Sequence, residues 1–235
     1  MSPMVESHPC EVRFQAASDQ SLLVYFGEYI TRPAHGQILK LLHLLQFEPV
    51  AGVVNLHPAY CSLLLKFDPL RLRHEELEAT LRLYLDRLAE IRLPPPREVE
   101  IPVCYGPECG LDLQAVAARQ GMDAAQVIAL HSAASYLVYF LGFVPGFAYL
   151  GDVHPALLTP RLETPRRQVA GGSVGIAGGQ CGIYPRPTPG GWNLIGRTPV
   201  SLFRADREAM SLLAMGDLVR FKPVSHHQFI GWEAA

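Results

Sequence analysis

Three consecutive prolines, Pro94, Pro95 and Pro96, constrain this chain more than any other feature of its sequence. Each proline lacks a backbone N–H and has a fixed φ angle, so neither a helix nor a central strand can pass through the triplet. Such a segment is typical of an extended connection between two folded parts. We therefore predict one domain over residues 1–93 and a second over residues 98–235.

The residues before the prolines alternate strand and helix patterns. A helix beginning at Pro33 has apolar residues at helical spacing, namely Ile38, Leu41, Leu42 and Leu45. Strands are predicted at 11–16, 21–26, 50–55 and 60–67, and a second helix at 73–90. The last two strands are predicted to be separated by a break at His57-Pro58. This ββαββα order predicts a small α+β domain in two layers, with the helices covering one face of a sheet.

The residues after the prolines are dominated by short β patterns between glycine and proline turns. The chain has 20 Gly and 20 Pro, which is above the usual share and favours a turn-rich fold. Strands are predicted at 98–104, 136–141, 173–177, 182–184, 193–196, 200–203, 217–221 and 228–230, with helices at 113–120 and 124–131. Asp123 and Gln126 form a capping-box pattern at the second helix. Many short strands indicate a β-barrel or sandwich.

Charge and composition exclude several classes of partner. Lys and Arg total 20 and Asp and Glu total 22, which leaves a net charge of −2. This balance argues against non-specific nucleic-acid binding and provides no polybasic membrane patch. No apolar run approaches the ~18 residues of a membrane helix, and no signal-peptide pattern is present. We therefore expect a cytoplasmic protein without nucleic-acid or membrane partners.

The cysteine pattern favours free thiols. The five cysteines are Cys10, Cys61, Cys104, Cys109 and Cys181, and an odd number in such a chain argues against a disulfide framework. Four residues separate Cys104 from Cys109, which is not a zinc-knuckle spacing, and no second ligand pair lies nearby. We expect no structural metal.

A glycine-rich run over residues 170–184 superficially suggests a phosphate-binding loop. The residues after Gly179 cannot begin a helix, as a dinucleotide-binding loop requires, and no lysine occurs between Lys66 and Lys222. We therefore predict a β-hairpin in which backbones approach closely, and no ATP site in this chain. Ser173 lies in a Gly-x-Ser-x-Gly sequence, the pattern of a nucleophile elbow. We treat the match as chance, because the strand–turn–helix context is missing.

The candidate site residues lie around these turns. Phe143, Phe147 and Tyr149 surround a Pro145-Gly146 turn, either as a packed aromatic corner or as the wall of an apolar pocket. Nearby hydrogen-bonding and aromatic groups that suit a small carboxylate- or amide-bearing ligand are Gln180, Tyr184, Trp192 and Arg197. Arg197 either forks onto a ligand carboxylate or pairs with an internal acid.

His131 is the candidate acid or base. Its side chain titrates near neutral pH, which suits proton transfer. The alternative is structural, because a histidine near a helix C-terminus interacts favourably with the helix dipole.

Several blocks of the chain resemble the Kip inhibitor/allophanate hydrolase subunit 1 family. The most distinctive block is the sequence YFLGFVPGFAYL at residues 139–150. Further matching blocks follow in the same order as in the family, at residues 58–65, 67–69, 101–106, 127–131, 172–178, 182–185 and 189–199. Long ordered blocks that cover nearly the whole chain are much more specific than a short motif.

The resemblance implies a fold and a function. The fold would be a small ββαββα domain followed by a cyclophilin-like β-barrel. Bacterial members act as the B subunit of an ATP-dependent 5-oxoprolinase, which converts 5-oxo-L-proline to L-glutamate together with an A subunit and a cyclophilin-like C subunit. This chain would hold no cofactor, and the complex would use ATP. The alternatives are a regulatory protein that inhibits a sensor histidine kinase, and a subunit related to urea carboxylase or allophanate hydrolase.

The resemblance also selects site residues within the matched blocks. His131 and Arg197 become the candidate catalytic residues. Gln180, Tyr184 and Trp192 become the candidate substrate-binding residues.

Overall fold

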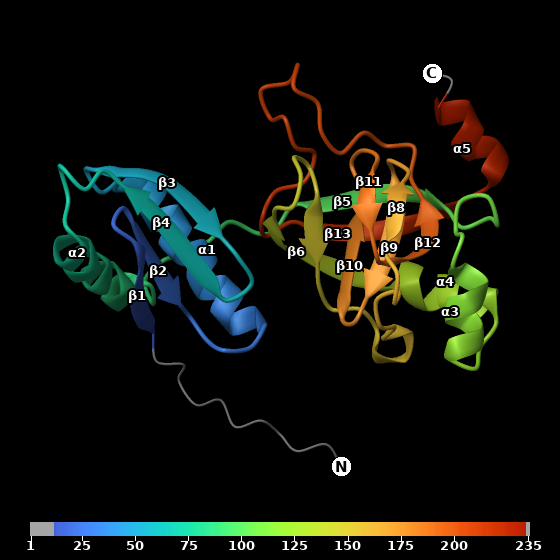
Figure 1. The fold of residues 1–235 in the computed structure, drawn as a ribbon, viewed down its shortest axis with the longest axis horizontal. Coiled ribbons are helices and arrows are strands. Elements are labelled where there is room, and N and C mark those ends of the chain that lie inside the picture. Colours follow the sequence, from blue (N-terminus) through green and yellow to red (C-terminus); the bar gives the residue numbers. More distant parts are fainter. Residues whose placement is uncertain (1–11, 234–235) are drawn as a thin grey trace, which may run out of the picture. The chain divides into compact units, whose positions relative to one another are not determined.

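The computed structural model describes residues 12–233 and divides the chain into two compact units, one ending at Pro95 and the other beginning at Pro96 (Figure 1). The division falls inside the proline triplet. A mixed α+β fold with a barrel is confirmed. That each unit is an independent domain with the limits 1–93 and 98–235 stays a prediction.

The first unit is a four-stranded antiparallel sheet with two helices. The strand order is β1-β2-β4-β3, and the strands are β1 (Arg13–Ser18), β2 (Ser21–Tyr25), β3 (Val53–Pro58) and β4 (Ser62–Phe67). Alternate residues of the central strands are fully buried, as Leu22 and Val24 on β2 illustrate. One face of the sheet therefore carries the core of this unit.

The helices α1 (Arg32–Phe47) and α2 (His74–Arg87) lie on one side of that sheet (Figure 1). The Thr31 hydroxyl caps α1 by accepting the Ala34 N–H at 3.3 Å, and Pro33 stands in the first turn, where its missing N–H costs nothing. Ile38 and Leu41 of the predicted stripe are fully buried. The predicted ββαββα order is thus present.

The predicted break at His57-Pro58 is wrong. Strand β3 runs through both residues to Pro58 and pairs with β4 alone. A proline is tolerated there because β3 is an edge strand, where the missing N–H faces no partner. Part of the first predicted strand, Glu11, lies outside the described residues.

The second unit is built on a closed seven-stranded barrel in the order β10-β7-β6-β13-β5-β12-β9. Its strands are β5 (Glu98–Cys104), β6 (Ser135–Leu141), β7 (Ala148–Leu150), β9 (Ser173–Ala177), β10 (Gln180–Ile183), β12 (Asn193–Arg197) and β13 (Leu218–Val224). Strands β5 and β13 pair in parallel and the other neighbours are antiparallel. Fully buried residues such as Ile101, Val138 and Val219 fill its interior.

The glycine-rich run forms the predicted hairpin. Strands β9 and β10 pair antiparallel across a turn at Gly178-Gly179, and β10 begins at the next residue, Gln180. A strand therefore follows the glycines, where a phosphate-binding loop would open a helix.

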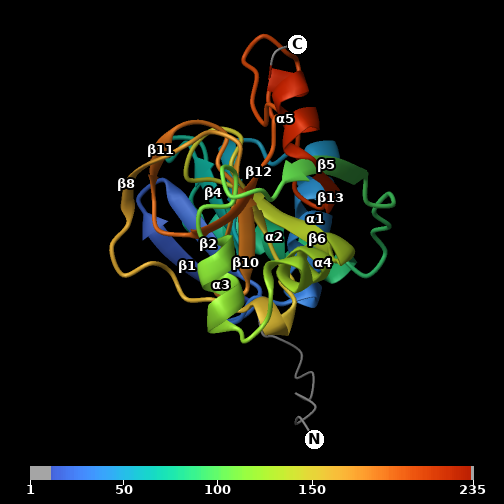
Figure 2. The same ribbon diagram turned by 90° about the vertical axis from the view of Figure 1, so that its right-hand side faces the viewer.

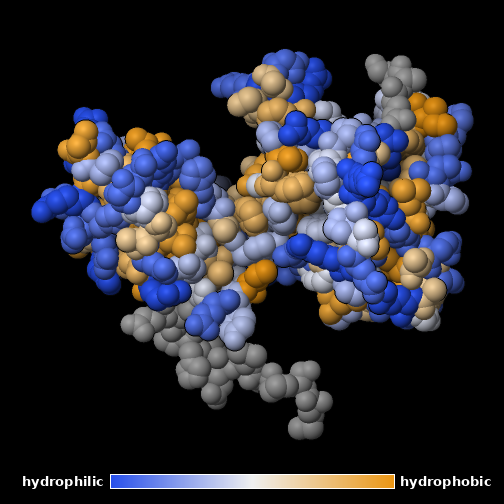
Figure 3. Space-filling model, viewed as in Figure 1, coloured by the Kyte–Doolittle hydropathy of each residue, from blue (hydrophilic) through white to orange (hydrophobic). Residues whose placement is uncertain are grey.

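Helices cover parts of the barrel unit. Figure 2 shows α3 (Leu113–Arg119) and α4 (Ala124–Ala133) together, away from α5 (His226–Glu233). The Asp123–Gln126 capping box is confirmed, with both reciprocal bonds at 2.8 Å. Hydrophobic residues on the visible face of this unit stand among hydrophilic ones (Figure 3).

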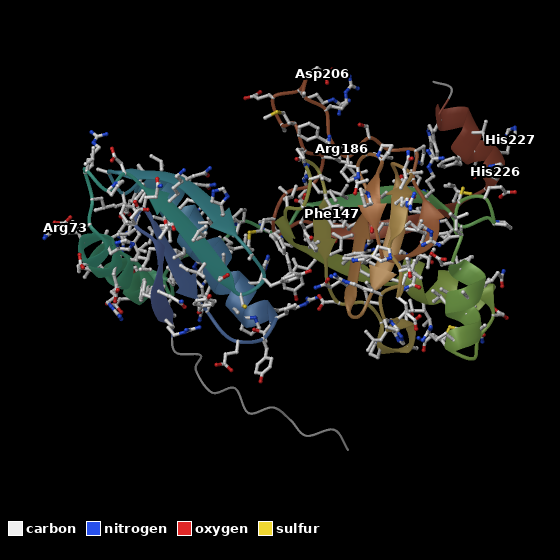
Figure 4. The ribbon with its side chains drawn as sticks, viewed as in Figure 1. Arg73, Phe147, Arg186, Asp206, His226 and His227 are labelled. Carbon is white, nitrogen blue, oxygen red and sulfur yellow. The ribbon has the colours of Figure 1, made fainter. Side chains whose placement is uncertain are left out.

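Two strand predictions in this unit are wrong. Residues 228–230 belong to α5, not to a strand, because Ser225 and Gln228 form a capping box that starts a helix. His226 and His227 lie on this helix (Figure 4). Residues 200–203 form no strand, and only Phe203 makes an isolated bridge, to Ser211.

Three short strands and a helical turn were not predicted. They are β7, which completes the barrel, the pair β8 (Arg166–Val169) and β11 (Thr188–Gly190), and the 3₁₀ turn η1 (Pro155–Leu157). None of the described helices is long and apolar enough to cross a lipid bilayer.

Candidate functional site

An aromatic pocket of about 200 Å³ opens on the barrel unit. Its lining comes from three stretches that are far apart in the sequence, namely Phe143, Phe147 and Tyr149, then Arg161, Leu162 and Pro165, then Tyr184, Pro189, Gly190, Gly191 and Trp192. We call this set the aromatic pocket. Two predicted ligand residues, Tyr184 and Trp192, are therefore brought together with the predicted aromatic corner.

The rings of the pocket pack edge to face around Phe147. Its ring centroid lies 5.4 Å from that of Tyr184, 5.6 Å from that of Trp192 and 4.9 Å from that of Tyr149. Phe147 itself is buried among the barrel strands (Figure 4). Such T-shaped pairs favour a defined ring orientation in addition to burying apolar area.

The glycines around the pocket make room for these rings. A Cβ on Gly182 would lie 2.9 Å from the Phe147 ring and 3.0 Å from the Trp192 ring, and a Cβ on Gly190 would overlap the Tyr184 hydroxyl. Close approach of side chains to bare backbone is the usual reason for glycine inside a strand. The glycine pattern is therefore explained by aromatic packing.

The turn before Phe147 holds an exposed ring at the pocket mouth. Phe143 has φ of 66° and Gly146 has φ of 84°, both in the left-handed region. Phe147 N–H donates to the Val144 carbonyl at 3.0 Å, which closes the turn. A bulky residue rarely adopts positive φ, and residues held in that way concentrate at functional sites. The sequence pattern predicts positive φ at Gly146 but not at Phe143.

One cation and two hydroxyls add polarity to the pocket. Burial raises the pKa of Tyr149 and of Tyr184, while the positive charge of Arg161 acts in the opposite direction on both. Both phenols are therefore protonated at neutral pH and can donate a hydrogen bond. The backbone N–H of Trp192 lowers the pKa of Tyr184, but the opposite effect of burial is larger.

A buried carboxylate braces the pocket from behind. Asp112 accepts from the Arg166 guanidinium at 2.6 Å and from the Leu194 N–H at 2.7 Å. It thereby joins the start of α3 to strands β8 and β12, whose neighbouring residues line the pocket. Sequence reasoning missed Arg161, Arg166 and Asp112, because each is an ordinary charged residue without a local motif.

An Asp112→Asn change is expected to destabilise this unit by about 1.5–3 kcal/mol, the usual contribution of a hydrogen bond to a charged group. The amide keeps an acceptor for Leu194 but removes the charge that offsets the half-buried Arg166. Urea unfolding followed by tryptophan fluorescence measures the loss, because Trp192 and Trp232 both lie in the barrel unit. An Asp206→Asn control removes an exposed ion pair with Arg204 and should change little. Equal effects in the two variants would contradict the bracing role of Asp112.

His131 lies inside the barrel core and is completely buried. Its Nδ1 atom is 2.7 Å from the Tyr105 hydroxyl, its Nε2 atom is 3.4 Å from the Cys181 sulfur, and its ring stacks on Phe221 at 4.5 Å. Burial lowers the pKa of His131 to about 3. The imidazole is therefore neutral at physiological pH, with a hydrogen-bond partner for each nitrogen. His131 does not line the aromatic pocket, and its catalytic role stays a prediction.

Arg197 also stands apart from the pocket. Its Nε donates to the Gly171 carbonyl at 2.9 Å, and its guanidinium lies 5.4 Å from the centroid of the Phe229 ring on α5. These contacts connect the end of β12 to the glycine hairpin and to α5. The predicted role of Arg197 on a ligand carboxylate stays a prediction, as does that of Gln180, which is half-buried at the start of β10 and outside the pocket lining.

The described cysteines, Cys61, Cys104, Cys109 and Cys181, are free thiols. Cys10 lies outside the described residues. Between residues 12 and 233, no group of three or more His, Cys, Asp or Glu side chains is arranged to hold a metal ion.

The chain is similar to known proteins along most of its length. It is 38% identical to the 5-oxoprolinase B subunit of Bacillus subtilis, over 93% of this chain and 96% of that protein. It is 54% identical to the 5-oxoprolinase B subunit of Escherichia coli O157:H7, over 55% of this chain and 60% of that protein. These matches confirm the resemblance carried by the sequence blocks.

A solved structure has the same fold. The crystal structure of TTHA0988 superposes with a TM-score of 0.77 at 42% identity, over 88% of this chain. The present chain spans 40% of the TTHA0988 chain, so that protein is much longer. The family described as the carboxyltransferase domain, subdomain C and D, matches residues 12–213. The chain therefore belongs to the family of carboxyltransferase subdomains C and D.

Proposed function

We propose that this chain is the B subunit of a 5-oxoprolinase, an enzyme complex that opens 5-oxo-L-proline to L-glutamate. The observation that carries the proposal is the 38% identity with the B subunit from Bacillus subtilis, which extends over 93% of this chain and 96% of that protein. A match over nearly the whole of both chains supports a shared role better than a shared domain would. The barrel unit is, in this proposal, the cyclophilin-like barrel expected for the family.

The names of these relatives imply a complex of several chains, and we propose that the partners are an A subunit and a cyclophilin-like C subunit. A lactam is a stable amide, so the complex couples its opening to ATP. The glycine-rich run of this chain forms a hairpin that lacks the lysine and helix of a phosphate-binding loop, which supports placing the nucleotide on a partner. A cytoplasmic location, which the free thiols favour, stays a prediction.

Reconstitution tests this function. The purified chain alone is expected to show no turnover of 5-oxo-L-proline, with or without ATP. The chain mixed with the A and C subunits from the same genome is expected to release L-glutamate and ADP together. Glutamate formation is measured by a coupled dehydrogenase assay and ADP by chromatography. A mixture that assembles but produces no glutamate would overturn the proposal, and inhibition of a sensor histidine kinase would then become the function to test.

A further inference from the structure

We propose that the aromatic pocket is a binding site for a small lactam ring with a carboxylate, and that Arg161 binds that carboxylate. The identity of the ring as 5-oxo-L-proline rests on the proposed function. The site itself rests on the pocket, on its unpaired cation and on the strained residue at its mouth.

The size and lining of the pocket select a single small ring. Its volume of about 200 Å³ is below the ~300–1,000 Å³ of pockets that hold drug-sized ligands. Five aromatic side chains form the wall, so the faces of a flat ring of atoms would find apolar contact on several sides. A nucleotide would extend beyond this volume into solvent, whereas a single five-membered ring would be enclosed by it.

The charge of the pocket selects an anion. Arg161 is exposed at the pocket lining, and it makes no ion pair or hydrogen bond with any other residue between 12 and 233. The other arginine beside this region, Arg166, is already paired with Asp112 at 2.6 Å. Arg161 therefore has its full set of donors free for a ligand, and the planar guanidinium matches a carboxylate with two parallel hydrogen bonds.

The Tyr184 hydroxyl in the pocket lining selects an amide rather than a purely apolar ring. Burial raises the pKa of Tyr184, which lines the pocket, so its phenol keeps its proton at neutral pH and can donate to a carbonyl oxygen. A lactam carbonyl supplies the acceptor that this arrangement needs.

The strain at Phe143 is consistent with a ligand-contacting residue. The side chain is 60% exposed although it is large and apolar, and its backbone has φ of 66°. Packing alone does not explain the position, because an exposed ring gains little from burial. A ligand seated beneath it would cover the ring and remove apolar surface from water.

Direct binding to the full chain tests the site. A Trp232→Phe background leaves Trp192, in the pocket wall, as the sole tryptophan. Titration of its fluorescence with 5-oxo-L-proline is expected to saturate. Titration with 2-pyrrolidinone, which has the same ring without the carboxylate, is expected to require about tenfold or more higher concentration, the usual effect of losing a charge-assisted hydrogen bond. Equal affinity for the two compounds would overturn the role given to a carboxylate.

Variants test whether Arg161 is the cation that binds the carboxylate. Arg161→Gln is expected to abolish the preference for 5-oxo-L-proline over 2-pyrrolidinone, while Arg167→Gln, an exposed arginine outside the pocket lining, keeps it. Phe143→Ala removes an exposed side chain, so it should weaken the binding of both compounds without lowering the urea midpoint of unfolding. An unchanged preference in Arg161→Gln, or loss of preference in Arg167→Gln, would overturn the assignment.

The reconstituted complex separates this inference from the proposed function. If the complex is active, Arg161→Gln should raise the KM for 5-oxo-L-proline by about tenfold, and an unchanged KM would overturn the site while leaving the function intact. If the complex is inactive but the chain still prefers the carboxylate-bearing ring through Arg161, the function fails and the site stands.

Discussion

Acidification from pH 6.5 to pH 3 is expected to remove about 4–5 kcal/mol of unfolding free energy from the barrel unit through His131 alone. The imidazole is completely buried among Tyr105, Tyr136, Cys181 and Phe221, and burial lowers its pKa to about 3. In the unfolded chain the same side chain titrates at its ordinary pKa of 6.5.

The sign of the effect follows from proton binding. Between pH 6.5 and pH 3 the unfolded chain binds a proton at His131 and the folded chain does not, so lowering the pH favours unfolding. The contribution of the neutral imidazole is complete above pH 6.5 and is lost as pH falls toward 3. The slope is about 1.4 kcal/mol per pH unit within that window.

Urea unfolding at several pH values between 7 and 4, followed by tryptophan fluorescence, measures this slope. His131→Gln keeps a polar group beside Tyr105 but cannot titrate, so its slope should be smaller than that of the wild type by about 1.4 kcal/mol per pH unit. His227→Gln, on the exposed side of α5, is the matched control. The carboxylates contribute equally to the pH dependence of the unfolding free energy in all three proteins, so they cancel in the comparison. A wild-type slope that persists in His131→Gln would contradict a neutral, buried histidine.

The fold followed from the sequence where the signal was local or repeated. The proline triplet divides the two compact units, and the capping box at Asp123 starts α4 as predicted. The sequence-based predictions failed where the tertiary structure decides the local conformation. Pro58 stays in a strand because β3 is at an edge, which the sequence does not reveal. The helix α5 was predictable from Ser225 and Gln228, but the apolar residues after them favoured a strand.

The site was only half predictable for the same reason. Tyr184, Trp192 and the aromatic corner stand out because large rings next to glycines are unusual, and the structure brings them together. Arg161 reaches the pocket by a long irregular connection after η1, and nothing local distinguishes it from other exposed arginines. Arg161 was overlooked, whereas His131 was singled out although it lies outside the pocket lining. Histidine as a residue type suggested acid or base catalysis. Its position in the core instead keeps the imidazole neutral and gives it two hydrogen-bond partners, Tyr105 and Cys181.

A Gly172→Ala change is expected to destabilise the barrel unit by about 2–5 kcal/mol, although no ligand or charge is involved. Gly172 has φ of 80°, and a Cβ there would overlap the Thr198 carbonyl. Its N–H donates to the Tyr184 carbonyl at 2.7 Å and its carbonyl accepts from Thr198 at 2.9 Å, so the backbone has no freedom to move aside. Positive φ contributes about 1–2 kcal/mol of this loss and steric overlap the remainder.

Gly178→Ala is the matched comparison, since it lies in the same glycine-rich run and has φ of 55° but nothing within 4 Å of a new Cβ. It should cost only the conformational part, about 1–2 kcal/mol. Urea unfolding of the two variants therefore distinguishes two explanations for the glycines. Glycines retained for packing give a much larger loss at 172 than at 178, because only Gly172 is enclosed by neighbouring backbone. Glycines retained only for backbone freedom would give equal losses, and that result would contradict close packing as the reason for Gly172.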